Sequence, residues 1–214
     1  MRSIPYTWDT LNFENLSKNK INWMVSNRFL TLTPNNYNLL KEHFKGKHID
    51  LLKRYPNEFI ENQIDYSLDE DDVLALLDFS EFSQQQKISI IQNTNNKLII
   101  NNKELSNSIC NILSACQYIE LDFTVLQSLI QHGRSEENKL KLFNLQFDLL
   151  SHEQITKLLN TLGEPYSDIA IKGRRPSLPK DQINFDLVCK LKEKDYISSF
   201  KEKKDTIKVY TKNH

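Results

Sequence analysis

The sequence predicts a mostly α-helical fold that ends in a small α+β subdomain. Apolar residues recur at helical spacing through most of the chain, as at Ile155, Leu158 and Leu162. Residues typical of helix N-caps precede several of these segments. Near the C-terminus, segments 197–200 and 206–210 are rich in β-forming residues and flank a polar loop, which predicts a β-hairpin.

Composition narrows the possible classes of protein. The 214 residues include 28 Lys and Arg and 28 Asp and Glu, and 39% are hydrophobic. These values are typical of a globular chain of one or two domains and exclude a disordered or fibrous protein. The longest apolar run, 73–77, is far shorter than the roughly 20 residues of a membrane helix. With no signal-like N-terminus and three scattered Cys, we expect a cytoplasmic chain without membrane contact.

Local capping signals mark the helices, of which we expect seven to nine. Several pairs fit or approach the capping box, in which a Ser side chain and a residue three positions later satisfy backbone donors of the first turn. These pairs are Ser67 with Glu70, Ser83 with Gln86, Ser151 with Gln154 and, more weakly, Ser135 with Asn138. Thr33 precedes Pro34, which suits a first helical position. Gly133 and Gly163 follow helical segments and predict left-handed C-caps.

Parts of the helical region resemble one another. Ser83-x3-Lys87-Ile88 matches Ser135-x3-Lys139-Leu140, and Ser151 is followed by apolar residues at similar offsets. This predicts an irregular α-helical repeat array of short helical hairpins, with a generic helical bundle as the alternative. The repeat starts lie 52 and then 16 residues apart. We expect the Asn-rich segment 93–102 to be a loop or an extended link.

The last part of the chain has a different character. A helix expected over 181–194 leads into the hairpin, which is the layout of a winged helix. The segment 173–179 before it is a basic connector that contains prolines. We therefore expect a repeat-like helical domain over 1–164 and a winged-helix-like subdomain over 165–214.

Charge divides the chain in the same way. From Lys172 onward there are twelve Lys and Arg against six Asp and Glu, which leaves a net charge of −6 for residues 1–171. Segment 58–82 has nine carboxylates and no Lys or Arg. It is interpreted as an acidic face that is solvated or that binds a basic partner. The candidate partner-binding residues are Asp65, Asp69, Asp72 and Asp78.

The sequence indicates no catalytic, cofactor or metal site. His43 and His48 are five residues apart and would not lie on one side of a helix. Cys110, Cys116 and Cys189 lack zinc or redox spacing and are expected to be structural. A hydrolase site assembled from distant His and carboxylates remains an open alternative.

Nucleic-acid binding is the main alternative function, because the C-terminal part is basic. In that case Arg174, Arg175, Lys180, Lys203 and Lys204 would contact phosphates, and Gln182 and Asn184 would read bases at the start of the helix. The carboxylates interleaved with these basic residues argue against nucleic-acid binding.

Three sets of residues carry a family resemblance. They are Leu32-Thr33-Pro34 through Leu40 with His48-Ile49, Leu76-Leu77-x5-Ser83-x3-Lys87-Ile88, and Tyr196 through Phe200 with Ile207-Lys208-Val209. Together they resemble the C-terminal helical region of large bacterial P-loop NTPases called YobI-like. No Gly-x4-Gly-Lys-Ser/Thr occurs here, so the resemblance implies an accessory or sensor region without the NTPase domain. The function expected is protein–protein interaction with an unidentified partner, without enzymatic activity.

Overall fold

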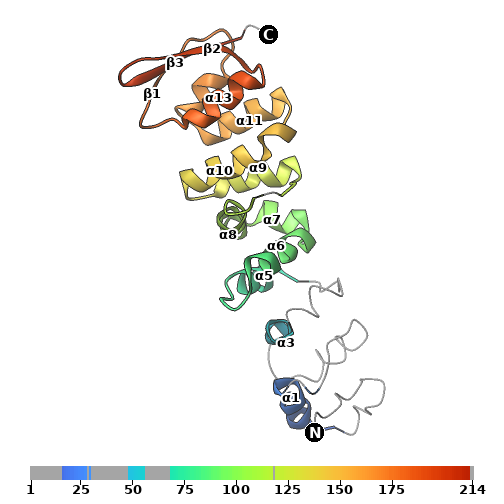
Figure 1. The fold of residues 1–214 in the computed structure, drawn as a ribbon. Helices are drawn as coiled ribbons and strands as arrows, with labels where there is room; N and C mark the ends of the chain where they lie inside the picture. Colours follow the sequence, from blue (N-terminus) through green and yellow to red (C-terminus); the bar gives the residue numbers. More distant parts are fainter. Residues whose placement is uncertain (1–15, 28, 30–47, 56–67, 118, 213–214) are drawn as a thin grey trace. The chain divides into compact units, whose positions relative to one another are not determined.

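The computed structural model describes residues 16–27, 29, 48–55, 68–117 and 119–212. Within these ranges the chain forms eleven α-helices, one 3-10 helix and three β-strands (Figure 1). The expected mostly α-helical fold with a C-terminal α+β part is confirmed. The chain divides into two compact units, Met1–Asn95 and Asn96–His214, which are described separately.

Unit 1 contains four described helices. They are α1 (Lys18–Ser26), α3 (His48–Arg54), α5 (Glu70–Leu77) and α6 (Gln84–Asn93). The side chains of Ile21, Leu51 and Leu76 are fully buried in its core. Tyr55, just after α3, donates a hydrogen bond from its hydroxyl to the carbonyl of Val25 in α1 (3.3 Å). The start expected at Thr33 and Pro34 lies outside the described residues.

Of the other two helix starts predicted in unit 1, one is correct. Ser83 and Gln86 form the capping box at the start of α6. Helix α5, however, begins at Glu70 with Asp69 as its N-cap, whose carboxylate accepts from the Asp72 N–H (2.9 Å). Ser67 lies outside the described residues. The prediction was wrong because a carboxylate two residues later in the chain serves as the cap equally well.

Unit 2 contains most of the described helices. They are α7 (Asn96–Asn101), α8 (Lys103–Leu113), α9 (Phe123–His132), α10 (Glu136–Gln146), η3 (Phe147–Leu149), α11 (His152–Leu162), α12 (Tyr166–Ala170) and α13 (Phe185–Glu193). Ser135 caps α10, and the capping box of Ser151 with Gln154 starts α11, as predicted. The loop expected over 93–102 is wrong, because most of it forms α7. Burial of Ile99 outweighs the low helix propensity of its Asn neighbours.

The two glycines expected as left-handed caps differ in conformation. Gly163 ends α11 with the positive φ of 77° that was expected, but its ψ of −164° is extended and not that of a left-handed helical residue. Gly133 ends α9 with φ −59°, so the left-handed prediction is wrong there. A Cβ at this position would lie 2.9 Å from Cys110 Sγ, the Leu129 carbonyl oxygen and Lys139 Cγ. Glycine is required at 133 by close packing and not by its backbone angles.

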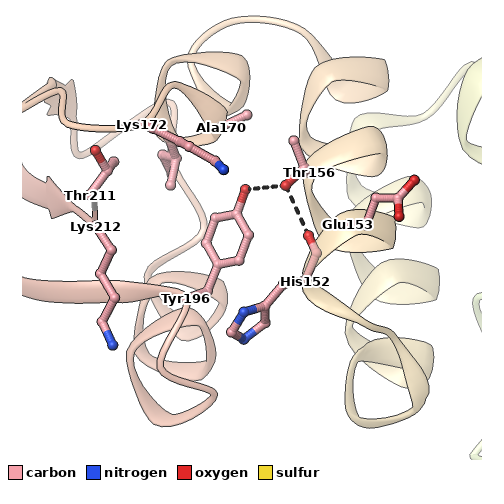
Figure 2. A pocket seen from close by; sticks show the side chains of 9 residues that line it. His152, Glu153, Thr156, Ala170, Lys172, Tyr196, Thr211 and Lys212 are labelled. Carbon is pink, nitrogen blue, oxygen red and sulfur yellow. Dashed lines mark hydrogen bonds between the residues drawn. The ribbon is translucent and has the colours of Figure 1, made fainter. Parts of the chain in front are cut away.

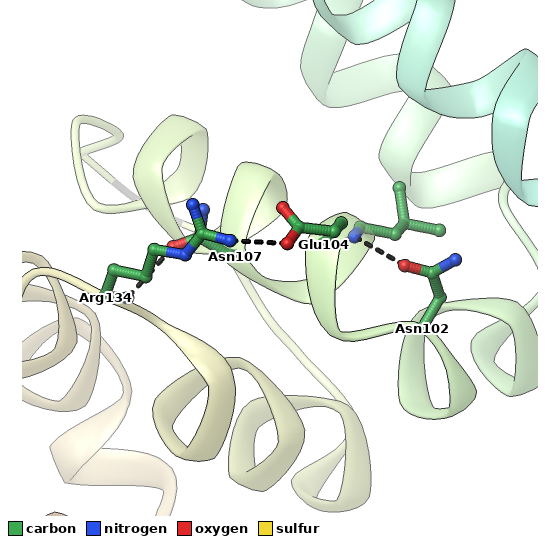
Figure 3. A network of polar contacts seen from close by, with 5 residues as sticks. Asn102, Glu104, Asn107 and Arg134 are labelled. Atoms are coloured by element: carbon green, nitrogen blue, oxygen red, sulfur yellow. Dashed lines mark hydrogen bonds and ion pairs between the residues drawn. The ribbon is translucent and has the colours of Figure 1, made fainter.

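Polar side chains fix the turn after α9 against α8 (Figure 3). Arg134 forms an ion pair with Glu104, and its N–H donates to Asn107 Oδ1 (2.9 Å). Asn102 caps α8 by accepting from the Leu105 N–H (2.9 Å). Deeper in the unit, the hydroxyls of two buried serines, 106 and 128, lie 3.0 Å apart. These contacts hold α8 and α9 in one arrangement.

The α+β part contains β1 (Ser177–Pro179), β2 (Ile197–Glu202) and β3 (Thr206–Thr211) in an antiparallel sheet of order β1-β3-β2. The hairpin β2–β3 matches the prediction. Strand β1 was missed, because it lies in the segment interpreted as a connector. It pairs Leu178 with Ile207 on β3. Phe185 at the start of α13 packs edge-on against Phe200 of β2 (5.6 Å between ring centroids).

The boundary expected between residues 164 and 165 lies inside unit 2. Lys190 Nζ on α13 donates to the Asn144 carbonyl (3.0 Å). Lys194 Nζ donates to the carbonyls of Phe147 (2.9 Å) and Asp148 (2.8 Å). These ammonium groups satisfy carbonyls at the C-terminal end of α10 and at η3, where positive charge is favourable. The contacts join residues on the two sides of the expected boundary, and a separate subdomain there stays a prediction.

Candidate functional site

The sheet has one buried face and one outward face. On β3, Ile207 and Val209 are buried, so Lys208 and Tyr210 point to the opposite side. Register places Lys201 and Ser199 of β2 opposite Lys208 and Tyr210, and Ser177 of β1 also opposite Lys208. These residues, together with Arg175 just before β1, are called the outer sheet face below.

Tyr210 is the centre of this face. The Arg175 guanidinium and the Lys208 ammonium each lie 5.8 Å from the centroid of its ring. Cation–π attraction therefore holds two positive groups beside one half-exposed aromatic side chain. Lys201 and Lys208 occupy directly opposite positions on neighbouring strands. Like charges at such positions destabilise a sheet, so the pair is not explained by the stability of the fold.

Cations next to the outer sheet face are neutralised by carboxylates. Arg174 pairs with Asp168 (3.2 Å) and Lys180 pairs with Glu202 (3.0 Å). Glu202 lies opposite the buried Ile207 and so is in register with the inner face of the sheet. The strand positions of the outer sheet face carry Lys, Ser and Tyr and no carboxylate. The face is therefore a compact positive surface with an aromatic centre.

The structure separates the residues predicted to contact nucleic acid. Arg175 belongs to the outer sheet face, and Lys203 and Lys204 are exposed at the turn between β2 and β3. Arg174 and Lys180 are in the ion pairs described above. Asn184 is the N-cap of α13 and accepts from the Leu187 N–H (2.9 Å), while Gln182 is exposed before that helix.

Sequence reasoning missed Lys201, Lys208 and Tyr210 as site residues. The alternation of apolar and polar residues over 206–210 was visible and places Lys208 and Tyr210 on one face. The register that sets Lys201 opposite Lys208 depends on the hairpin geometry. The position of Arg175 depends on β1, which the sequence did not indicate.

Helix α13 carries mixed charges: Asp186 and Glu193 occur with Lys190 and Lys192. The carboxylates of Asp186, Glu193 and Glu202 are close enough to the Cys189 thiol to affect its ionisation. Burial and the negative charge of these carboxylates raise the pKa of Cys189 above its ordinary value. The exposed side of α13 therefore has mixed charge and does not form a basic surface.

The acidic residues predicted to bind a partner lie in unit 1. Asp69 caps α5, Asp72 is in its first turn, and Asp78 is the exposed C-cap residue. A carboxylate at Asp78 is electrostatically unfavourable beside the last carbonyls of the helix. Asp65 lies outside the described residues, so the four do not form a described site.

The remaining titratable candidates are placed as follows. His43 lies outside the described residues, and His48 is the first residue of α3. Cys110 is buried, and burial raises the pKa of its thiol to about 11. In the parts of the chain that the structure describes, no three His, Cys, Asp or Glu side chains are grouped to hold a metal ion.

Comparison with known proteins gives one relative. The chain is 36% identical over 208 residues to the "Uncharacterized membrane protein YobI" of Bacillus subtilis (strain 168). The match covers 96% of this chain but only 17% of the length of that relative. No family model and no solved structure matches the chain.

These findings correct three expectations. The relative is described as an uncharacterised membrane protein, and nothing in the comparisons supports a P-loop NTPase family. The same description contradicts the expected cytoplasmic location and the expected lack of membrane contact. Among the described residues, none of the helices combines the length and apolar character needed to span a bilayer. The lack of a long apolar run concerns only this chain, and the match covers a small part of the relative.

Proposed function

We propose that the chain is a non-enzymatic binding module whose outer sheet face contacts an acidic segment of another protein. The observation that carries this proposal is the opposed pair Lys201 and Lys208 beside Tyr210. An acidic partner would relieve the repulsion between the two ammonium groups. Tyr210 would supply apolar contact area at the centre of the interface, where aromatic side chains contribute most.

In this proposal the helices of unit 2 form the scaffold that holds the outer sheet face. The repeated capped helices are interpreted as an irregular repeat array, and α13 with β2 and β3 as a winged-helix-like element. Consecutive short helices α8, α9, α10 and α11 with Asn, Asp or Ser caps support the first interpretation. The order helix, strand, strand with a third antiparallel strand β1 supports the second.

Single-stranded nucleic acid is the second candidate partner. An aromatic side chain on a sheet face beside Arg and Lys is the arrangement on which unpaired bases stack. Tyr210 with Arg175 and Lys208 favours this alternative. Insertion of α13 into a duplex groove is disfavoured, because Asp186 and Glu193 would approach phosphates and Asn184 is used as a cap.

Titration of the 214-residue chain with defined polyanions tests the proposal. The probes are poly-L-glutamate, a fifteen-nucleotide oligo(dT), and vesicles that contain phosphatidylserine, because the relative is described as a membrane protein. We expect poly-L-glutamate to bind and the Lys201→Glu/Lys208→Glu variant to weaken that binding at least tenfold. Binding should decrease with salt, since charge pairing drives it.

Two variants make the outcome specific. Lys103→Glu/Lys192→Glu changes the net charge equally at exposed lysines away from the outer sheet face and should have little effect. Tyr210→Leu should weaken oligo(dT) binding by roughly 5- to 100-fold if bases stack on the ring. It should affect poly-L-glutamate much less. Equal loss of binding in both charge-reversal variants would contradict the proposed face, and binding to oligo(dT) or vesicles alone would contradict the protein partner.

A further inference from the structure

A second site lies within unit 2, between α11, α12 and the ends of β2 and β3. A cavity of about 370 Å³ opens there (Figure 2). This volume is within the range of pockets that hold small molecules, roughly 300–1,000 Å³. Its lining includes Ile169 and Ala170 of α12 and the ring of Tyr196, which give it an apolar base. None of these residues belongs to the outer sheet face.

A chain of hydroxyl groups fixes the orientation of Tyr196. Thr156 Oγ1 on α11 donates to the His152 carbonyl (2.9 Å). Since a hydroxyl has one proton, Thr156 must accept from the Tyr196 hydroxyl, which lies 2.8 Å away. Burial raises the pKa of Tyr196, which keeps the phenol neutral. The Tyr196 oxygen keeps lone pairs with which it can accept a hydrogen bond at the wall of the cavity.

The His152 ring beside Tyr196 is equally constrained. His152 Nε2 lies 2.9 Å from the Lys194 carbonyl oxygen, and a carbonyl can only accept. Nε2 must therefore carry the proton. The imidazole also packs edge-on against the Tyr196 ring, with 5.6 Å between centroids. The neighbouring rings of His152 and Tyr196 thus form one wall of the cavity, which a flat ligand can contact without ordering it first.

Positive charge predominates at the cavity. Lys172 and Lys212 both line it. Lys212 is held by an ion pair with Asp195, which follows the C-cap of α13 and has the uncommon φ of 60°. The one carboxylate of the lining, Glu153, points away from Tyr196 in Figure 2 and pairs with Lys157 (2.8 Å). A ligand carboxylate would thus meet the Lys172 ammonium and a Lys212 ammonium that it would share with Asp195, while Glu153 is turned away.

We propose that this cavity binds a small organic anion with a flat apolar body. The apolar body lies against Tyr196 and Ala170, and Lys172 and Lys212 compensate the negative charge. The site is separate from the proposed partner-binding face and uses different side chains.

The test is an NMR titration of the full chain with 2-naphthoate and with 2-naphthamide. The two probes share the flat apolar body and differ in charge. We expect 2-naphthoate to cause saturable shifts of the Thr156, Tyr196 and Thr211 amide signals. The amide should bind at least tenfold more weakly. Equal affinities, or shifts centred on Lys208 and Tyr210, would refute the site.

Variants separate this cavity from the rest of the surface. Lys172→Gln/Lys212→Gln should weaken 2-naphthoate binding at least tenfold and 2-naphthamide binding less than twofold. Ala170→Leu should block both probes by filling the cavity, provided that circular dichroism shows a folded chain. The exposed Lys192→Gln is the control and should bind like the unmodified chain. Undiminished 2-naphthoate binding in the lysine variant would overturn the proposal even if Ala170→Leu does not fold.

Discussion

Replacing Gly133 with Ala tests whether close packing fixes the turn between α9 and α10. The backbone angles of Gly133, φ −59° and ψ 132°, are ordinary for any residue. The added methyl would lie 2.9 Å from Cys110 Sγ, the Leu129 carbonyl oxygen and Lys139 Cγ. Lys139 has a flexible side chain that can move. Leu129 offers a backbone atom in the last turn of α9 and Cys110 a buried sulfur, and neither can move freely.

The expected loss of stability follows from two opposing terms. Overpacking a filled core costs about 1–3 kcal/mol. Ala also restricts the unfolded chain, which stabilises a compatible position by about 0.4–1 kcal/mol. We therefore expect the free energy of unfolding to fall by about 1–2 kcal/mol. For a unit of this size, the melting temperature should drop by about 3–8 °C.

The measurement is urea and thermal unfolding followed by far-UV circular dichroism. Both tryptophans, Trp8 and Trp23, belong to unit 1, so circular dichroism is chosen because it follows the helices of unit 2 directly. Adding Cys110→Ala should recover part of the Gly133→Ala loss, because it removes one of the clashing atoms. An unchanged or raised midpoint in Gly133→Ala, or no coupling with Cys110→Ala, would refute the packing argument.

Three further predictions concern unit 2. Burial raises the pKa of Cys110 from 9.0 to about 11, so the unfolded chain loses this proton first. The free energy of unfolding should be unaffected below pH 9 and should fall by up to about 2–3 kcal/mol towards pH 11. Urea titrations at several pH values measure this loss, and the Cys110→Ala variant should not show it. Asp195→Gly relieves the φ of 60° but also removes the ion pair with Lys212, so the free energy of unfolding should rise by no more than about 0.5–1 kcal/mol; a lower melting temperature would contradict this. Ser151→Ala should cost about 1 kcal/mol in the same assay by removing the α11 cap.

Features that depend on neighbours in sequence could be predicted. Capping boxes involve residues three positions apart, so Ser83 with Gln86 and Ser151 with Gln154 were identified without knowledge of the fold. The start of α5 was misplaced because Ser67 and Asp69 are both good caps, and local rules do not choose between them. The hairpin β2–β3 likewise depends on a short connection.

Features that depend on distant parts of the chain were missed. Helix α7 consists of Asn, Lys and apolar residues, and contact with α8 stabilises it. Ser106 donates its hydroxyl to the Ile99 carbonyl (2.6 Å). Strand β1 is stabilised by pairing with β3. Next to this pairing, the Val209 N–H donates to the Pro176 carbonyl (2.9 Å). Neither partner can be inferred from the local sequence.

The proposed cavity was missed for the same reason. Its lining comes from α11, α12, the start of β2 and the end of β3, with no repeated spacing. His152 and Tyr196 are 44 positions apart and meet only because α13 returns the chain to α11. The position of His152 in the first turn of a capped helix was predicted correctly. Its proposed role in the cavity depends on contacts with residues distant in sequence.

The end of β3 contributes to both proposed sites, and this limits which variants can separate them. Tyr210 belongs to the outer sheet face, and the next two residues, Thr211 and Lys212, line the cavity. The Thr211 hydroxyl also lies 2.9 Å from the carbonyl oxygen of Arg174, the residue that directly precedes Arg175. A Thr211 substitution would disturb the position of Arg175 as well as the cavity. Lys201 and Lys172 lie outside this shared segment, so changes at these two positions report on one site each.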